Sequence, residues 1–252
     1  MRHDELSHEQ RDRAESFGAV AADYDRYRPG YPDPLIEDLV ARRPSSVLDI
    51  GCGTGKAARL LAGRGLRVLG VEIDPQMAGV ARSHGIDVEV SSFEKWDDRG
   101  RTFDLVTCAQ AWHWVDPAVG APKLVRVLNP DGVAALFWNF AEFDPATKAV
   151  VDAVYERLAP ELIGPAAAGD DRTHLRTLET TKVFSSLITE TYEWHRVESA
   201  DHWVGNVGTQ SNHLLLGPQR LREVQAALLE ALTAAGGEVR LTGGTYTIWA
   251  RP

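Results

Sequence analysis

The 252-residue chain contains only two cysteines, Cys52 and Cys108, and neither belongs to a CxxC pair or a Cys/His cluster. This scarcity argues against a disulfide framework and a structural zinc site, and we expect two free thiols in a reducing compartment. The first ten residues are charged and lack the apolar stretch of a secretory signal. No apolar run reaches the length of a membrane span. These absences predict a cytoplasmic protein without a bound metal.

The chain also has fewer basic than acidic residues. The chain has 27 Lys and Arg against 36 Asp and Glu, which gives a formal net charge of -9. This balance disfavours binding to a phosphate backbone or to an anionic membrane surface. The hydrophobic share of 44% is ordinary for a globular domain. We therefore expect a small-molecule substrate, no nucleic-acid or membrane partner, and a monomer or homodimer.

Between residues 45 and 139, short β-branched runs alternate with amphipathic helical stretches, which is the pattern of βαβ units. The predicted strands are Val47–Ile50, Arg67–Glu72, Asp87–Ser91, Phe103–Ala109 and Gly132–Asn139. The predicted helices run from about Gly55 to Gly65, Pro75 to His84 and Pro117 to Leu128. Such units form a doubly wound parallel sheet that binds ligands at the carboxyl ends of its strands.

A glycine-rich turn follows the first predicted strand and holds Gly51, Gly53 and Gly55. Glycine allows a tight strand-to-helix turn and lets a ligand approach the backbone. A dinucleotide fingerprint requires its third glycine one residue later. A Walker loop requires glycine where Ile50 stands and Ser or Thr where Ala57 stands. The spacing therefore weakens both phosphate-binding interpretations, while a simple βα turn without a ligand stays open.

Asp49, just before the turn, indicates the charge of the ligand. A carboxylate there would repel a pyrophosphate but suits a ligand that carries an ammonium group, through direct contact or through water. S-adenosylmethionine (SAM) carries an α-amino group as well as its sulfonium. A structural role, in which Asp49 only bonds the turn amides, is compatible with this interpretation.

The segment Val47–Lys56 resembles motif I of the class I SAM-dependent methyltransferases, and Val71–Pro75 resembles the end of their second strand. The resemblance implies that Glu72 accepts both ribose hydroxyls, which a carboxylate can do. It also implies that Ile73 and Met77 flank the adenine, although either could instead be a core residue.

The next motif departs from the family pattern. Many members have Gly-Asp-Ala after the third strand, with the Asp on the adenine amino group, but this chain has Ser91–Glu94 there. The resemblance then leaves the adenine to one hydrogen bond of Ser92 and to the Phe93 amide.

Phe103–Val115 resembles the fourth strand of the family and the loop after it. Ala109 and Gln110 are then expected beside the methionine part of SAM. His113 is a candidate general base, since histidine titrates near neutrality, or else a structural histidine. Trp112 and Trp114 would exclude water or support the sulfonium by cation–π contact, or simply pack the loop.

Phe17–Pro32 resembles a stretch found in the subgroup that includes trans-aconitate-type methyltransferases. The resemblance implies that this segment closes over SAM, with Tyr24, Tyr27 or Arg28 near the methionine carboxylate. The planar fork of arginine suits that contact. Tyr27 is also expected on the substrate side, as is His213 in the polar stretch 206–213.

The resemblance covers about residues 17–139 and implies an α/β fold. This is a Rossmann-like, doubly wound, mostly parallel seven-stranded sheet with an antiparallel C-terminal strand and a helical lid. We expect an N-terminal lid or helical segment over 1–44 and a SAM-binding core over 45–139. The remaining 140–252 are expected to form a helical cap plus C-terminal strands, with a last strand Thr245–Arg251 after Gly243-Gly244.

The expected activity is methyl transfer from SAM to an O, N or C nucleophile of a small molecule, with S-adenosylhomocysteine (SAH) as product. Two alternatives stay open. The chain could bind SAM on the same fold without transferring a methyl group, or it could be an NAD-dependent oxidoreductase. The early third glycine and Asp49 argue against the oxidoreductase.

Overall fold

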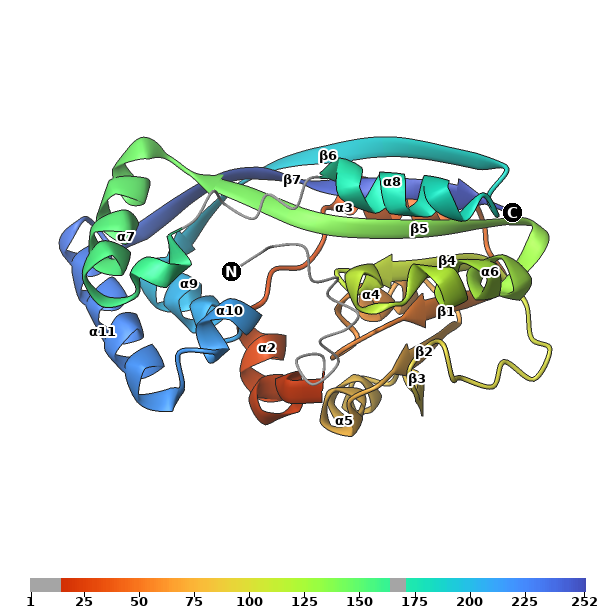
Figure 1. Ribbon diagram of the computed structural model, residues 1–252, viewed down its shortest axis with the longest axis horizontal. Helices are drawn as coiled ribbons and strands as arrows, with labels where there is room; N and C mark the ends of the chain where they lie inside the picture. Colours follow the sequence, from red (N-terminus) through yellow and green to blue (C-terminus); the bar gives the residue numbers. More distant parts are fainter. Residues whose placement is uncertain (1–14, 164–170) are drawn as a thin grey trace.

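The computed structural model describes residues 15–163 and 171–252. Its centre is a seven-stranded sheet in the order β3-β2-β1-β4-β5-β7-β6, shown in Figure 1. Neighbours from β3 to β5 are parallel, and β7 runs antiparallel to both β5 and β6. The strands are β1 Val47–Ile50, β2 Val68–Glu72, β3 Asp87–Val90, β4 Phe103–Ala109, β5 Leu128–Phe143, β6 Ser186–Ser199 and β7 Glu238–Arg251. The expected fold class is confirmed.

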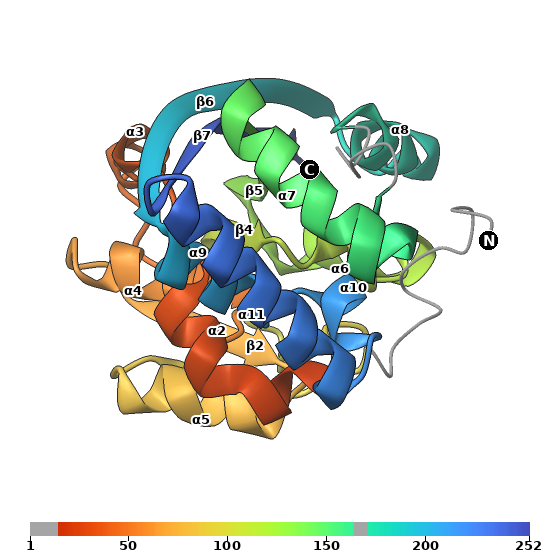
Figure 2. The same ribbon diagram turned by 90° about the vertical axis from the view of Figure 1, so that its left-hand side faces the viewer.

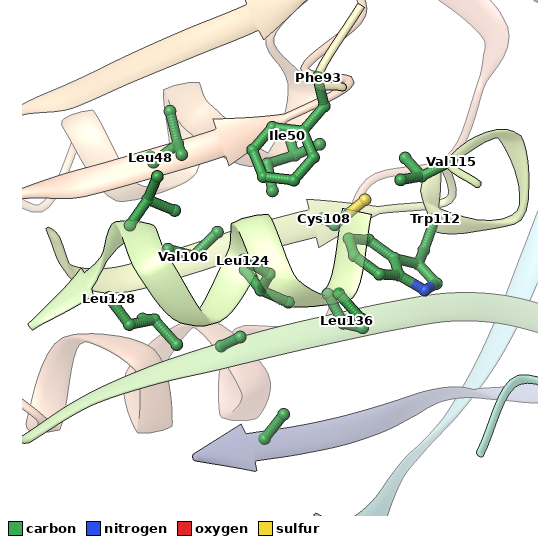
Figure 3. Close-up of a cluster of buried hydrophobic side chains, with 14 of the residues drawn as sticks. Leu48, Ile50, Phe93, Val106, Cys108, Trp112, Val115, Leu124, Leu128 and Leu136 are labelled. Atoms are coloured by element: carbon green, nitrogen blue, oxygen red, sulfur yellow. The ribbon is translucent and has the colours of Figure 1, made fainter. Parts of the chain in front are cut away.

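Helices cover both faces of the sheet because its central strands are apolar on both sides, as parallel sheets require. Helices α3 (Asp33–Ala41) and α4 (Lys56–Ala62) pack on one face, with Leu39 and Leu61 against Leu105. Helices α6 (Pro117–Val127) and α8 (Asp171–Thr181) cover the other face. Helix α5 (Pro75–Ser83) packs beside α4 near β2 and β3. Figure 3 shows the second face, where Leu124 of α6 lies over Val106 and Leu136.

A helical cap stands on the extended ends of β5, β6 and β7, beyond the parallel core (Figure 1). It consists of α7 (Pro145–Leu158), α9 (Ala200–Val207), α10 (Ser211–Leu214) and α11 (Pro218–Ala234). These helices share their own hydrophobic cluster, which includes Val154, Trp203 and Leu228. Helix α2 (Ala21–Tyr27), preceded by the 3-10 helix η2 (Glu15–Val20), contacts α9 of the cap and α5 of the core. In Figure 2, α11 lies between α7 and α2.

Two predicted strand starts were wrong by several residues. Gly243 and Gly244 lie inside β7, which begins at Glu238, instead of preceding the strand. A Cβ at Gly243 would lie 2.1 Å from the Phe140 carbonyl oxygen, so glycine permits a close approach between β7 and β5. Strand β5 begins at Leu128 instead of Gly132, because residues 129–132 are accommodated by a register shift opposite β4.

The predicted domain division remains a prediction, and the part of the 1–44 segment before residue 15 lies outside the described residues. The described remainder forms η2, α2 and α3. Across 15–163 and 171–252, no helix combines the length and apolarity needed to cross a membrane.

Candidate functional site

A cavity of about 290 Å³ opens at the carboxyl ends of β1, β2 and β4, where it is bordered by α2 and the start of α10. This is the edge at which doubly wound sheets bind ligands. Its wall includes the predicted site residues Tyr24, Arg28, Gly51, Gly53, Glu72, Ile73, Met77, Ser92, Phe93, Ala109, Gln110, His113 and Trp114. The structure therefore brings together residues that are up to ninety positions apart in the chain.

Glu72, the last residue of β2, is held rigidly in the cavity wall. Its Oε2 accepts the Gly53 amide at 2.7 Å, and its Oε1 accepts the Asp74 amide at 2.9 Å. Burial raises the pKa of this carboxyl, and the backbone donors partly oppose that effect. A carboxylate has about four acceptor positions, so two remain for ligand hydroxyls.

The glycine turn is shaped by close contacts as well as by backbone angles. Gly51 has φ +61°, and a Cβ there would lie 2.5 Å from the Cβ of Ala111. A side chain at this position would therefore clash with the loop after β4 as well as strain the backbone. Gly55 is the residue before α4 and faces Ala81 and Ile86, so it does not line the cavity.

Asp49 lies beneath this turn and is fully buried. Its Oδ1 accepts the Thr107 hydroxyl at 2.7 Å, and its Oδ2 has no hydrogen-bond partner among the described residues. Burial raises the pKa of Asp49 to about 7, with a smaller contribution from the charge of Glu72, against the lowering effects of the Thr107 bond and of the Ala58 backbone amide. An incompletely paired buried carboxylate is costly, so a nearby cation would stabilise its charged form.

The outer end of the cavity lies beyond β3. The Ser91 amide donates to the Glu72 carbonyl at 2.9 Å, which places this loop directly beside the end of β2. The Ser92 hydroxyl is buried without a hydrogen-bond partner in the described part of the chain. Phe93 is buried and packs near Ile50 (Figure 3).

The other end of the cavity is formed by the loop after β4. Gln110 has φ +59°, a strained conformation for a residue other than glycine, and its amide donates to the Phe137 carbonyl at 2.8 Å. Such outliers are concentrated at functional sites. The Trp138 indole N–H donates to Nδ1 of His113 at 3.4 Å. A neutral His113 then carries its proton on Nε2, so a general-base role would require it to give up the Trp138 bond.

Helix α2 is tied to the core and to the cap. Asp25 accepts the Arg59 guanidinium at 2.6 Å and pairs with Nε2 of His84 at 2.9 Å. Arg28, which lines the cavity, donates from Nε and Nη2 to the hydroxyl and carbonyl of Thr209, both at 2.9 Å. The segment that carries Tyr24 and Arg28 is thus fixed at both ends.

Besides Asp49 and Gly55, three predicted residues lie outside the cavity wall. Trp112 is only 2% exposed and points into the core cluster of Figure 3. Tyr27 contacts His202 and lines a separate groove beside α9 and α11. His213 is buried in the cap.

Some cavity residues were not predicted: Ile50, Val71, Ser91, Glu94, Ala111, Val115 and Ser211. Most of them are immediate sequence neighbours of a predicted residue in the same motif. The position of each residue at a strand end was therefore the signal that could have identified it. Ser211 belongs to the polar stretch 206–213, from which only His213 was chosen. The functional roles of all these residues remain predictions.

Comparison with known proteins gives one consistent result. Residues 48–136 match the family described as a methyltransferase domain. An uncharacterized methyltransferase of Mycobacterium tuberculosis is 41% identical over 132 residues, which is 51% of this chain and 54% of that protein. The chain thus spans about half the length of the first curated relatives that it matches.

Solved structures extend the similarity over most of the chain. A protein from Anaeromyxobacter dehalogenans, described as a type II methyltransferase, superposes with a TM-score of 0.65 at 28% identity. The match covers 89% of this chain and 98% of that one. A SAM-dependent methyltransferase from Thiobacillus denitrificans, solved with SAH, has a TM-score of 0.50 at 18% identity over 92% and 97% of the two chains. This last likeness is one of fold.

Proposed function

We propose that this chain, which is similar to SAM-dependent methyltransferases, binds SAM in this cavity and transfers the methyl group to a small-molecule acceptor. The observation that carries the proposal is Glu72, a buried carboxylate held by two backbone amides and facing the cavity beside the glycine turn. Its two remaining acceptor positions suit a pair of neighbouring ribose hydroxyls.

The charges around the cavity fit this cofactor. Asp49 beneath the turn leaves one buried oxygen without a partner in the described residues, which suits an ammonium group nearby, directly or through water. Arg28 at the α2 side offers a guanidinium to a carboxylate. A pyrophosphate would instead meet the carboxylate of Glu72, with the carboxylate of Asp49 buried beneath the turn, so this arrangement disfavours a dinucleotide.

When bound, SAM supplies an electrophilic methyl group on a good leaving group. The protein then has to align the acceptor and exclude water. Trp114 and His113 form the cavity wall next to Gln110, and Ser211 of the cap lies on the same wall. His113 as general base, and the trans-aconitate-type subgroup, remain predictions.

Calorimetric titration with SAM, SAH and NAD tests the proposal. We expect SAM and SAH to bind and NAD not to bind. Loss of two hydrogen bonds to a charged group in Glu72→Ala should weaken SAH binding by at least about 30-fold. Glu161→Ala, which removes an exposed carboxylate in the cap, is the matched control and should bind like the native protein. NAD binding, or no adenosyl binding by folded protein, would refute the proposal.

The transfer step is tested separately. SAM would be incubated with panels of amine, hydroxyl and carboxylate acceptors, and SAH formation would be measured. An acceptor-dependent rise in SAH above the background of protein with SAM alone is the expected result. A protein that binds SAM tightly but forms no SAH with any panel would favour the non-transferring alternative.

A further inference from the structure

Arg28 places a positive charge in the cavity wall without a matching negative one. Its side chain is half-buried and lines the cavity. Across residues 15–163 and 171–252, no carboxylate forms an ion pair with its guanidinium. A partly buried cation gains from a nearby anion, so this part of the cavity favours a ligand that supplies a negative charge.

The cap holds one edge of this guanidinium. Thr209 lies between α9 and α10 and is fully buried. Its hydroxyl oxygen accepts a hydrogen bond from Nε of Arg28, and its carbonyl oxygen accepts one from Nη2, each at 2.9 Å. Because the guanidinium is planar, fixing one edge fixes the direction of the whole group. The end of the group, formed by Nη1 and the second N–H of Nη2, is left for a ligand.

Thr209 is itself fixed by its own turn. Its amide donates to the carbonyl oxygen of Asn206 at 2.9 Å, and its hydroxyl donates to the same oxygen at 2.7 Å. The hydroxyl proton is thus committed, and the hydroxyl oxygen serves as an acceptor for Arg28. The guanidinium carbon of Arg28 also lies 5.1 Å from the ring centre of Tyr24. Arg28 is therefore held between a buried threonine of the cap and an aromatic ring of α2.

An oriented arginine binds a carboxylate better than a mobile one. A carboxylate can accept two parallel N–H bonds from a guanidinium, but only when the two planes are aligned. Ordering a long side chain at the moment of binding costs conformational entropy. The two bonds to Thr209 remove much of that freedom from Arg28 before a ligand arrives.

We propose that Thr209 is a positioning residue that orients Arg28 for the carboxylate of the amino-acid part of the cofactor, so that the cap takes part in cofactor recognition. This inference rests on the proposed SAM site. It assigns a role to a residue outside the cavity wall. Linkage between binding and conformation is reciprocal, so a cofactor held through Arg28 also stabilises residues 206–210 of the cap.

Calorimetric titration of the full chain with SAH and with decarboxylated SAH tests this role. Decarboxylated SAH keeps the amino group and lacks the carboxylate. Thr209→Val removes the hydroxyl but keeps the branched shape, so it should weaken SAH binding by about fivefold or more and decarboxylated SAH binding by less than about twofold. Thr209→Ser keeps the hydroxyl and should bind both ligands like the native protein.

Thr181→Val is the matched control for Thr209→Val. The Thr181 hydroxyl also donates to the carbonyl three residues earlier, that of Leu178, at 2.6 Å. Thr181 lies at the end of α8 and does not line the cavity. Its substitution should change neither dissociation constant.

A double-mutant cycle shows whether Thr209 acts through Arg28. Arg28→Lys keeps the positive charge but loses the planar group, so it should also weaken SAH selectively. In the Arg28→Lys background, Thr209→Val should change the SAH dissociation constant by less than about twofold. A full fivefold loss in that background would assign Thr209 a structural role and overturn the inference.

Hydrogen exchange of the native protein adds a measurement that needs no variant. At equal saturation, SAH should slow the exchange of amides 206–210 by at least about threefold more than decarboxylated SAH does. Equal slowing by the two ligands would contradict the inference.

The outcomes separate this inference from the proposed function. If the native protein binds both ligands equally tightly, the inference is overturned and the SAM site stays intact. The same holds if Thr209→Val, shown to be folded by its thermal unfolding, binds SAH like the native protein or loses affinity for both ligands to the same extent. If neither ligand binds to the native protein, the proposed function fails and this inference with it.

Discussion

The parallel core and the helical cap each bury a titratable group whose pKa is shifted by burial, Asp49 in the core and His213 in the cap. In the core, Asp49 has its pKa raised to about 7 because burial disfavours its charge. In the cap, His213 has its pKa lowered to about 4, again mainly by burial, with a contribution from Arg28. Burial therefore keeps both groups closer to their neutral forms.

The difference lies in how completely the neighbours satisfy each group. Nδ1 of His213 donates to the Asn212 side-chain oxygen at 2.9 Å, and its Nε2 accepts the Tyr155 hydroxyl at 2.8 Å. Asp49 has one oxygen bonded to Thr107 and one without a described partner. The His213 cluster is complete within the protein, whereas one oxygen of Asp49 has no partner in the described residues. If SAM binds as proposed, the core is the half of the molecule whose polar groups depend on the ligand.

The largest expected effect comes from breaking the core turn. Gly51→Val should destabilise the fold by about 3–5 kcal/mol, because it combines a left-handed backbone angle with overpacking against Ala111. SAH binding should be lost at temperatures where the protein is still folded. Thermal unfolding and calorimetry measure the two effects.

Gly65→Ala is the matched control for this variant. Gly65 has a similar angle, φ +85°, but a Cβ there meets no atom within 4 Å. Gly65→Ala should lower the free energy of unfolding by only about 1–2 kcal/mol and leave SAH binding unchanged. Equal losses of binding in the two variants would show that backbone strain, and not the contact with Ala111, controls the site.

The second prediction removes the charge of Asp49. In the folded protein the pKa of Asp49, about 7, lies above the ordinary Asp value of 3.8, so the folded state binds a proton more tightly than the unfolded state. The free energy of unfolding of the native protein should therefore fall as pH rises from about 4 to 7. Asp49→Asn should be more stable than the native protein at pH 8 by about 2–4 kcal/mol, with no such gain below pH 4. Urea unfolding across this range measures the difference.

The same variant should bind SAM more weakly, because the neutral amide no longer attracts an ammonium group. Stability and binding would then change in opposite directions. If Asp49→Asn bound SAM as tightly as the native protein, the charge of Asp49 would not contribute to SAM binding. Asp49 would then have only a structural role.

The third prediction concerns the cap. In the folded protein the pKa of His213, about 4, lies below the ordinary His value of 6.5, so the unfolded state binds a proton more readily. Its contribution to stability should be present above pH 6.5 and disappear as pH falls towards 4, by about 2–3 kcal/mol. His213→Gln should flatten this part of the pH profile of unfolding. His195→Gln on β6 is the control. If it changed the pH profile of unfolding as much as His213→Gln does, the effect would not be specific to His213.

The two halves also differ in how far the sequence predicts them. In the core, the strand β4 was predicted at its observed ends, and Gly51, Gly53 and Glu72 were predicted and line the cavity. Alternation and turn chemistry determine these features locally. In the cap, the length of β7 depends on its pairing with β5 and β6, which no local pattern records. Tyr27, predicted for the substrate side, faces another groove because α9 packs against α2.

The smallest expected effect tests the link between core and cap. Asp25 holds α2 on the core through Arg59 and His84, and the same helix leads to Arg28, which bonds Thr209 before the cap helix α10. Asp25→Asn weakens the ion pairs but keeps an acceptor, so SAH binding should weaken by about three- to tenfold, equivalent to about 1 kcal/mol. Asp33→Asn is the control, because the carboxylate of Asp33 is exposed on α3, and it should bind SAH normally.

The native protein should lose this contribution as pH falls, because the pKa of Asp25 is lowered in the folded state. Burial alone would raise this pKa, but the bonds to His84 and Arg59 together outweigh the effect of burial. If Asp25→Asn lowered stability but left the dissociation constant unchanged, α2 would act only as a structural clamp, and the cofactor site would be complete within the core.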